Sequence, residues 1–228
     1  MKKVGIVGGI GPASTLDYYI GIVNGCMEKY GGYPLVTVDS INMTEMCGYF
    51  EQKNYDAVAD LITDSIRNLM KAGAEFAAIA SNTPHIIYDR IFDDSPLPLI
   101  SITEATCGFI SEQGYKSPLI LGTKFTMESR MYEKELRRCG VEAVTLSDED
   151  ILSVHNIIFP KLENGIVIDD DKAKMLEICR RYATENGADS VILGCTEIPL
   201  MIKPGDTEIP SINTTAVHIK AIVEEMGR

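Results

Sequence analysis

One segment of the chain occurs twice, half the chain length apart. Residues 73–85 read GAEFAAIASNTPH and residues 187–199 read GADSVILGCTEIP. Both copies begin with Gly-Ala and an acidic residue, continue as a short apolar run and end in small polar residues. Ser81 in the first copy corresponds to Cys195 in the second, 114 residues further along a chain of 228. A repeat at half the chain length predicts two similar lobes.

The same offset aligns a second pair of segments. Residues 6–15, IVGGIGPAST, correspond to residues 120–129, ILGTKFTMES, and Tyr18 corresponds to Tyr132. In each copy an apolar run ends in glycine and is followed by a turn and a helix start. Two ungapped matches at one offset support an internal duplication of one folding unit.

Apolar runs bounded by glycine or proline alternate with amphipathic stretches along the chain, which predicts an α/β fold with mainly parallel sheets. We expect two similar α/β lobes related by pseudo-twofold symmetry, with the active site between them. The first lobe is residues 1–100, completed by a C-terminal helix in 208–228, and the second is residues 101–207. Predicted strands cover residues 3–7, 35–38, 76–80, 97–102, 118–122, 141–144 and 190–194. Predicted helices cover residues 13–28, 55–72, 103–113, 127–138, 170–186 and 215–226.

The composition excludes several classes of partner. A formal net charge of −12 opposes binding to nucleic acid or to an anionic membrane surface, because both favour a basic face. No run of about 18 apolar residues is present, so no membrane span is expected. The six cysteines are scattered, without C-x-x-C pairs or histidines at ligand spacing, so neither a metal site nor a disulfide framework is expected. These features predict a reduced, cytoplasmic protein.

The glycine-rich segment from Gly8 to Pro12 superficially resembles a dinucleotide fingerprint. Ser14 stands where the third glycine belongs, and no acidic residue follows about 20 positions later. We therefore do not expect a nicotinamide cofactor.

The repeat places Ser81 and Cys195 just beyond predicted parallel strands, where α/β proteins bind their ligands. Across a pseudo-twofold axis, the two side chains would approach one ligand from opposite sides. Two proton carriers on opposite faces of one carbon are what a 1,1-proton transfer requires. Thr83 and Thr196 are placed to donate hydrogen bonds to the carboxylate of the carbanion.

The chain resembles the aspartate/glutamate racemase family over nearly its whole length. The motifs that carry the resemblance are Gly8–Pro12, Ser81–His85, Leu121–Thr123 with Thr126, Ile157–Phe159 and Leu193–Glu197. It implies an amino-acid racemase that uses no cofactor, acts on aspartate, glutamate or both, and forms a homodimer. It also implies that Cys195 and position 81 are the catalytic acid/base residues. The residues that it implies for substrate binding are Ile10, Asn82, Thr83, Thr123, Thr126 and Thr196.

Two positions depart from the family pattern. Ser81 stands where the family has its other catalytic cysteine, and a hydroxyl is far less acidic than a thiol. We expect racemisation to be severely reduced and ligand binding to survive; the serine is either an introduced change that silences the enzyme or natural to a one-thiol member. The loop after the second predicted strand also lacks the arginine of aspartate-selective members. Gln52 or Lys161 would take its role, so glutamate or a broader substrate range is also consistent with the sequence.

Other interpretations of these residues stay open. A decarboxylase of a malonate-like acid needs only Cys195 to protonate a carbanion, and a pocket that binds acidic ligands without turnover needs no thiol. Cys195 as a buried structural cysteine and Ser81 as a helix N-cap are the plain alternatives. His85, the histidine closest to Ser81 in sequence, is interpreted as a packing residue.

Overall fold

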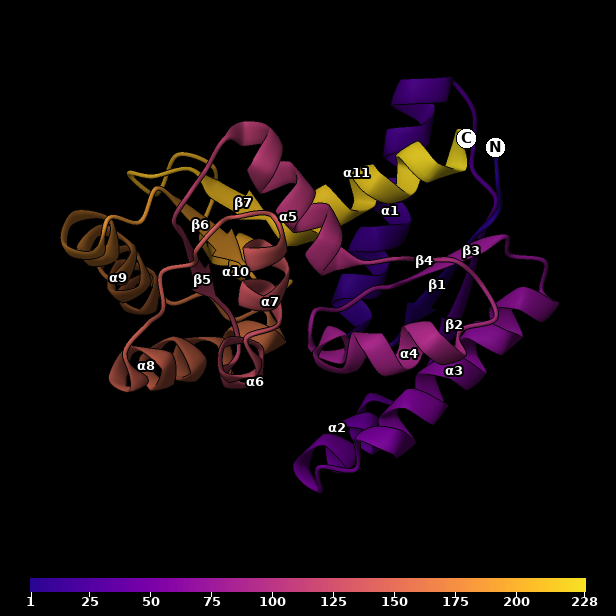
Figure 1. Cartoon of the computed structure of the whole chain (residues 1–228), viewed down its shortest axis with the longest axis horizontal. Coiled ribbons are helices and arrows are strands. Elements are labelled where there is room, and N and C mark those ends of the chain that lie inside the picture. The colour runs from indigo at the N-terminus through magenta and orange to yellow at the C-terminus, as the bar shows by residue number, and fades with distance from the viewer. The chain divides into compact units, whose positions relative to one another are not determined.

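The computed structural model describes every residue from Met1 to Arg228 (Figure 1). The chain divides into two units, residues 1–102 with 215–228, and residues 103–214. The segment 208–214, expected with the first lobe, lies in the second unit because β7 (Ser211–Asn213) pairs with β6 (Ser190–Leu193). None of the helices combines the length and the apolar character that crossing a bilayer requires.

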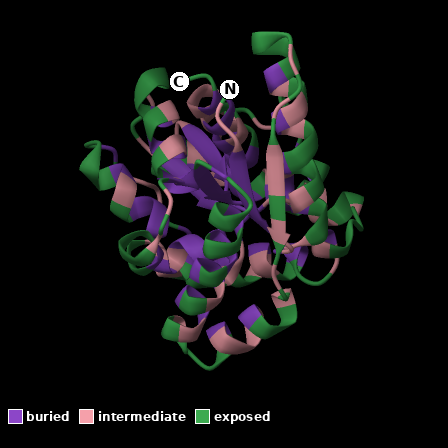
Figure 2. Cartoon of the chain, turned by 90° about the vertical axis from the view of Figure 1, so that its right-hand side faces the viewer, coloured by how far each residue is buried: buried purple, intermediate pink, exposed green.

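The first unit is built on a parallel sheet with the strand order β2-β1-β3-β4. Val4 of β1 lies opposite Val36 of β2 on one side and Phe76 of β3 on the other. β1 and β3 are buried along their whole length, whereas β2, at the edge, is only partly covered; the inner strands are purple in Figure 2 and the edge strand is pink and green. The strands are β1 (Val4–Gly8), β2 (Val36–Ser40), β3 (Phe76–Ile79) and β4 (Leu99–Ile100).

Helices cover both faces of this sheet. α1 (Pro12–Tyr30) and α11 (Thr214–Met226) lie side by side on one face, and α3 (Tyr55–Lys71) packs on the other (Figure 1). The two helices of the first face approach closely because Gly21 has no side chain. A Cβ atom at this position would lie only 2.7 Å from the Ile219 side chain. The remaining helices of this unit are α2 (Met43–Glu51), the 3-10 helix η1 (Thr83–Ile87) and α4 (Tyr88–Asp94).

The second unit has a parallel sheet with the order β5-β6-β7, where β5 is Pro118–Leu121. Val144 forms a single parallel bridge with Leu119 on the other side of β5, in the place that β2 occupies beside β1. The helices are α5 (Ile102–Gln113), α6 (Lys124–Ser129), α7 (Met131–Arg138), α8 (Asp148–Ile158), η2 (Leu162–Asn164), α9 (Asp169–Asn186) and α10 (Ile198–Met201).

The two sheets follow the sequence repeat. When 114 is added to the residue numbers of β3, they coincide with those of β6. The same shift places β1 on β5, with β1 one residue longer at its C-terminal end. An equivalent backbone hydrogen bond joins the C-terminal ends of the two strands in each unit. Ala80 N donates to Val7 O at 3.0 Å in the first unit, and Gly194 N donates to Leu121 O at 2.6 Å in the second. The helix after the last strand of each sheet, α5 or α11, belongs almost entirely to the other unit.

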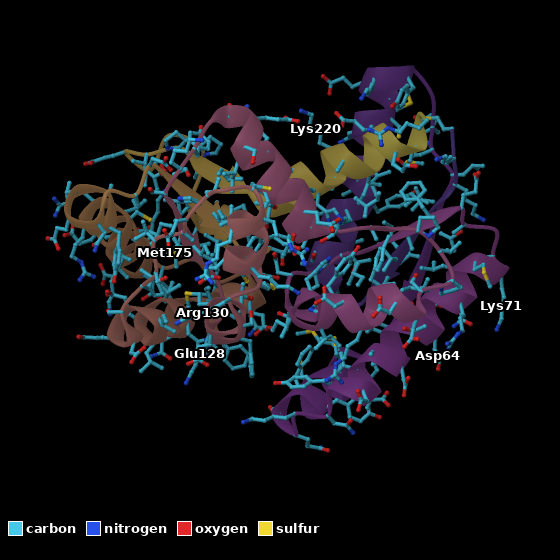
Figure 3. The ribbon with its side chains drawn as sticks, viewed as in Figure 1. Asp64, Lys71, Glu128, Arg130, Met175 and Lys220 are labelled. Carbon is cyan, nitrogen blue, oxygen red and sulfur yellow. The ribbon has the colours of Figure 1, made fainter.

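Several elements differ from those predicted. The single helix expected over 127–138 is interrupted at Arg130, whose left-handed backbone (φ 55°) separates α6 from α7; Figure 3 labels this residue at the junction. The strand expected over 141–144 is reduced to the bridge at Val144. The elements that were not predicted are α2, α4, α8, α10, β7 and η2. η1 is the helix for which Ser81 was a candidate N-cap, and its N-cap position is occupied by Asn82 instead.

Candidate active site

Two strand ends form the framework around Cys195 in the second unit. A Cβ atom at Gly122 would lie 3.2 Å from Gly194 O, and one at Gly194 would lie 2.9 Å from Leu121 O. The glycines therefore let the end of β6 approach the end of β5 backbone to backbone. This contact positions Cys195, the next residue, beyond the carboxyl ends of both strands.

The thiol of Cys195 has a carboxylate partner. Its Sγ–H donates to Oε2 of Glu197 at 2.9 Å, and only 9% of the cysteine is exposed. Burial, then the charge of Glu197 and this hydrogen bond, raise the pKa of Cys195 well above its ordinary value. The negative charge of Glu163 acts in the same direction. Cys195 is therefore a protonated thiol at neutral pH, with a proton acceptor in contact.

Three threonines surround the same two strand ends. Thr123 caps α6, with its Oγ1 accepting from the backbone N–H of Thr126 at 3.4 Å and lying 3.2 Å from the Thr126 hydroxyl. Thr126 is buried, and Thr196, next to Cys195, is half-buried. The structure thus brings together four predicted site residues of this unit: Thr123, Thr126, Cys195 and Thr196.

Ser81 occupies the equivalent strand end in the first unit. It follows Ala80, whose carbonyl accepts a hydrogen bond from Ser14 Oγ at 2.7 Å, and it is 8% exposed. Asn82 is buried beside it, and Thr83 is half-buried at the start of η1. At the offset of the repeat, Thr83 stands where the second unit has Glu197. The hydroxyl of Ser81 therefore lacks the carboxylate that Cys195 has at this position.

His85 is engaged at both ring nitrogens. Its Nδ1–H donates to the carbonyl of Ser81 at 3.0 Å, and its Nε2 accepts from the backbone N–H of Ile102 at 3.3 Å. Burial lowers its pKa to about 3, and the proximity of His218 adds to the effect. A neutral ring with both nitrogens occupied holds the backbone of position 81, and it has no free nitrogen to accept the Ser81 proton.

The three other predicted site residues are a core side chain, an exposed side chain and a side chain that is already paired. The Ile10 side chain is buried in the hydrophobic core of the first unit. Gln52 is exposed at the C-terminal end of α2. Lys161 precedes η2 and forms an ion pair with Asp171 at 2.9 Å, so its charge is balanced in the absence of a ligand.

Glu197 and Glu163 are the side chains at this site that the sequence analysis did not select. Glu197 is part of the quoted Gly-Cys-Thr-Glu motif, and its spacing of two from Cys195 is a signal that could have been used. Glu163 carries no comparable signal, because only folding brings it near Cys195. Burial, with the charge of Glu197, raises the pKa of Glu163.

Comparison with known proteins identifies the class to which this fold and these strand ends belong. The profile of the Asp/Glu/Hydantoin racemase family matches residues 7–222. The chain belongs to this family, and the comparisons support its assignment as an amino-acid racemase.

The chain is similar to individual proteins over nearly the whole length of both. The broad specificity amino-acid racemase RacX of Bacillus subtilis (strain 168) is 26% identical over 227 residues, which is 96% of each chain. The crystal structure of an aspartate racemase homologue from Pyrococcus horikoshii OT3 is 33% identical, with a TM-score of 0.88 and full coverage of both chains. Picrophilus torridus aspartate racemase, at 22% identity, TM-score 0.74 and coverage of 100% and 95%, shares the fold.

Proposed function

We propose that the chain racemises an acidic amino acid, aspartate or glutamate, by two-base 1,1-proton transfer without a cofactor, and that Ser81 impairs the reaction. The observation that carries the proposal is the equivalence of positions 81 and 195. Both follow a buried parallel strand of the repeat, and both are held by the same backbone hydrogen bond one residue earlier. The activities named for the relatives support the same chemistry.

The reaction breaks the Cα–H bond of the substrate and delivers a proton to the opposite face. A base on one face takes the proton, and the electron pair spreads into the substrate carboxylate. Cys195 Sγ–H then gives its proton to the carbanion from the other face, which inverts the centre and leaves a thiolate. The raised pKa keeps Cys195 protonated and able to donate, and Glu197, in contact with its Sγ–H, can take the thiol proton when Cys195 acts as the base in the reverse direction.

The serine side is the weak half of the reaction. A hydroxyl at position 81 would have to accept a Cα proton, and it can do so only after losing its own. Thr83 replaces the carboxylate partner, and both nitrogens of His85 are occupied. We therefore propose that α-proton exchange differs strongly between the two enantiomers and that their net interconversion is slow.

Polar groups next to the two carriers are proposed to hold the substrate. Asn82, Thr83, Thr123, Thr126 and Thr196 would donate hydrogen bonds to its carboxylate and accept them from its amino group. Ile10 would contribute its backbone, because its side chain is in the core. Lys161 would exchange Asp171 for the side-chain carboxylate of the substrate, with Gln52 as a second candidate.

The test is exchange of the α-proton in D₂O with each enantiomer of aspartate and glutamate. We expect the chain to exchange one enantiomer slowly, and Ser81→Cys to interconvert both at a rate higher by about 10²–10⁴-fold. Ser81→Ala is the matched control, and it should behave like the parent or more slowly. Absence of exchange with all four substrates in both the parent and Ser81→Cys would contradict the proposal.

A one-thiol decarboxylase is the second candidate, because only one strand end carries a thiol with a carboxylate partner. In this reaction a C–C bond of a disubstituted malonate breaks, carbon dioxide leaves, and the carbanion takes the proton of Cys195. Release of carbon dioxide that is lost in Cys195→Ala, without α-proton exchange on amino acids, would favour it. Thermal stabilisation by an acidic ligand with neither reaction would instead indicate a binding protein.

Assembly and location follow the same proposal. We propose a homodimer in a reducing, cytoplasmic compartment. None of the six cysteines is in a disulfide bond, which suits a compartment that keeps thiols reduced.

A further inference from the structure

The backbone of Ser81 is hydrogen-bonded on both sides of its Cα atom. Its N–H donates to Ile79 O at 2.8 Å, and its carbonyl accepts from Nδ1–H of His85 at 3.0 Å. The planar peptide groups before and after position 81 are therefore both held in place. Because the direction of Cβ follows from the backbone atoms around Cα, the side chain at this position can move only by rotation about χ1.

The partners of His85 fix its tautomer. A backbone carbonyl can only accept a hydrogen bond, and a backbone N–H can only donate one. The ring therefore carries its proton on Nδ1, facing Ser81 O, and accepts at Nε2 from the N–H of Ile102 at 3.3 Å. Burial lowers the pKa of His85 to about 3, so this neutral form persists at neutral pH. One side chain thus joins the end of β3 to Ile102, the first residue of α5 and the last residue of the first unit.

Two neighbouring rings hold the plane of His85. Tyr88 stacks on it, with ring centroids 5.3 Å apart and an interplanar angle of 12°. His218 lies edge-on, with centroids 6.2 Å apart and an angle of 84°. His218 is itself held, because its Nε2–H donates to Ile100 O at 2.8 Å and its Nδ1 accepts from the Tyr18 hydroxyl at 2.7 Å. Rotation of the His85 ring would disturb both neighbours, so its Nδ1–H keeps one direction.

The second unit has no histidine at the equivalent place. At the offset of the repeat, Pro199 stands where the first unit has His85. The end of β6 has a closer backbone contact instead, with Gly194 N donating to Leu121 O at 2.6 Å. The fold of the repeat therefore does not require the histidine, which is present only at the strand end that ends in Ser81.

We infer that His85 is a positioning residue for the proton carrier at position 81. It acts through the Ser81 carbonyl, by fixing the direction in which the side chain at position 81 points. This direction matters because a displacement of about 1 Å can lower the rate of a reaction step about 100-fold. The inference rests on the proposed racemase function and assigns a role within it to a residue whose sequence context indicates only packing. Packing accounts for the burial of His85, but not for its two directed hydrogen bonds.

Two amide substitutions separate these hydrogen bonds. The amide nitrogen of asparagine can take the place of Nδ1 and donate to Ser81 O, whereas the amide oxygen of glutamine can take the place of Nε2 and accept from Ile102 N–H. His85→Asn therefore keeps the bond to position 81, and His85→Gln keeps only the bond to Ile102. Each variant replaces the same ring by an amide, so each is the matched control for the other.

The kinetic experiment adds each change to Ser81→Cys and follows α-proton exchange of both enantiomers of aspartate and glutamate in D₂O. His85→Gln should lower kcat about 10–100-fold for the enantiomer that is deprotonated at position 81, with KM within about twofold, because positioning and not binding is lost. His85→Asn should stay within about fivefold of Ser81→Cys alone. Exchange of the other enantiomer, which uses Cys195, should change little. Equal losses in both variants, or equal losses for both enantiomers, would overturn the inference.

A second experiment needs no turnover. The thiol introduced by Ser81→Cys should react with iodoacetamide about tenfold faster when His85→Gln is added, because loss of one buried hydrogen bond allows local opening by about that factor. His85→Asn should leave the rate within about twofold. Peptide mass mapping identifies the thiol, and urea unfolding compares the stability of the two variants. Equal rates in both variants would overturn the inference. Different rates without any α-proton exchange would retain the positioning role and contradict the racemase proposal.

The parent chain gives a check that depends on no variant. Long-range ¹H–¹⁵N NMR correlations distinguish the two tautomers of a neutral imidazole, which differ in the nitrogen that carries the proton. At pH 7, His85 should be in the Nδ1–H form and His218 in the Nε2–H form. A His85 ring with its proton on Nε2 would overturn the inference, because that ring could not donate to Ser81 O.

Discussion

The C-terminal ends of β3 and β6 share one backbone arrangement but carry side chains that differ in their capacity for proton transfer. Both strands are buried, both lie beside the first strand of their sheet, and both are closed by the same backbone hydrogen bond. Beyond β6 lie Cys195 and Glu197 in direct contact, whereas beyond β3 lie Ser81 and Thr83. The duplicated backbone places the two proton carriers at equivalent positions. The side chain two residues further along decides whether the carrier has a carboxylate partner.

The two ends also differ in what supports them. Glycine at position 194 lets β6 come within 2.6 Å of Leu121 O, whereas Ala80 at the equivalent place leaves 3.0 Å. The Ser81 end is held instead by buried polar groups, with Ser14 on Ala80 and His85 on Ser81. A buried neutral side chain also supports the second strand end, where Thr214 Oγ1 donates to Leu193 O at 2.9 Å. Only the Ser81 end is held by a buried histidine, so the support of this end should respond to pH.

The largest expected effect comes from exchanging the two carriers. In the swapped variant Ser81→Cys with Cys195→Ser, the thiol lies on the other strand end, so the enantiomer that exchanges its α-proton should change. The ratio of exchange rates for the two enantiomers should shift by about 10²–10⁴-fold. Deuterium incorporation followed by NMR measures both rates. An unchanged preference would mean that the two positions do not serve opposite faces.

The next effect concerns pH and the two buried histidines of the first unit. Burial lowers the pKa of His85 to about 3 and that of His218 to about 4, from an ordinary value of 6.5. Because the unfolded chain takes up these protons first, stability is fully present above pH 6.5 and falls as the pH drops towards 4. Each histidine should cost on the order of 2 kcal/mol of unfolding free energy by pH 5.

Urea unfolding at pH 7 and pH 5 measures this loss. His218 accepts from the Tyr18 hydroxyl at 2.7 Å and donates to Ile100 O at 2.8 Å, so His218→Gln lowers stability at both pH values. The informative quantity is the difference between the two pH values, which should be smaller in His218→Gln than in the parent. Equal differences in parent and variant would show that His218 does not carry the effect.

The smallest expected effect is on the reactivity of Cys195. Glu197→Gln removes a charge and a charged hydrogen-bond acceptor that raise the thiol pKa, while burial remains. The midpoint pH for alkylation of Cys195 by iodoacetamide should fall, because two causes of its raised pKa are removed. Peptide mass mapping separates this residue from the exposed Cys139. Glu163→Gln is the control with a smaller shift in the same direction, and a rise in the midpoint with Glu197→Gln would contradict the assigned cause.

Much of the fold could be predicted because the signals are local. The apolar run at Phe76–Ile79 and its copy at Ser190–Leu193 predict strands, and the helical spacing of Tyr55–Lys71 predicts α3. α8 was missed although Ser147 followed by Asp150 is a capping signal, and that cap is formed, with Asp150 N–H donating to Ser147 Oγ at 3.2 Å. β7 was missed because three residues give too short a pattern. The break at Arg130 was missed because arginine carries no preference for a left-handed backbone.

The duplicated α/β architecture and the pair of residues at equivalent strand ends could both be recognised in the amino-acid sequence. Periodicity and repeats are properties of neighbouring residues, so they can be read without a structure. The contact of the Cys195 thiol with Glu197, the occupation of both nitrogens of His85 and the ion pair of Lys161 with Asp171 became known only from the folded chain. Burial, pKa values and pairing depend on residues distant in the chain, and no local pattern records which of them fold against each other.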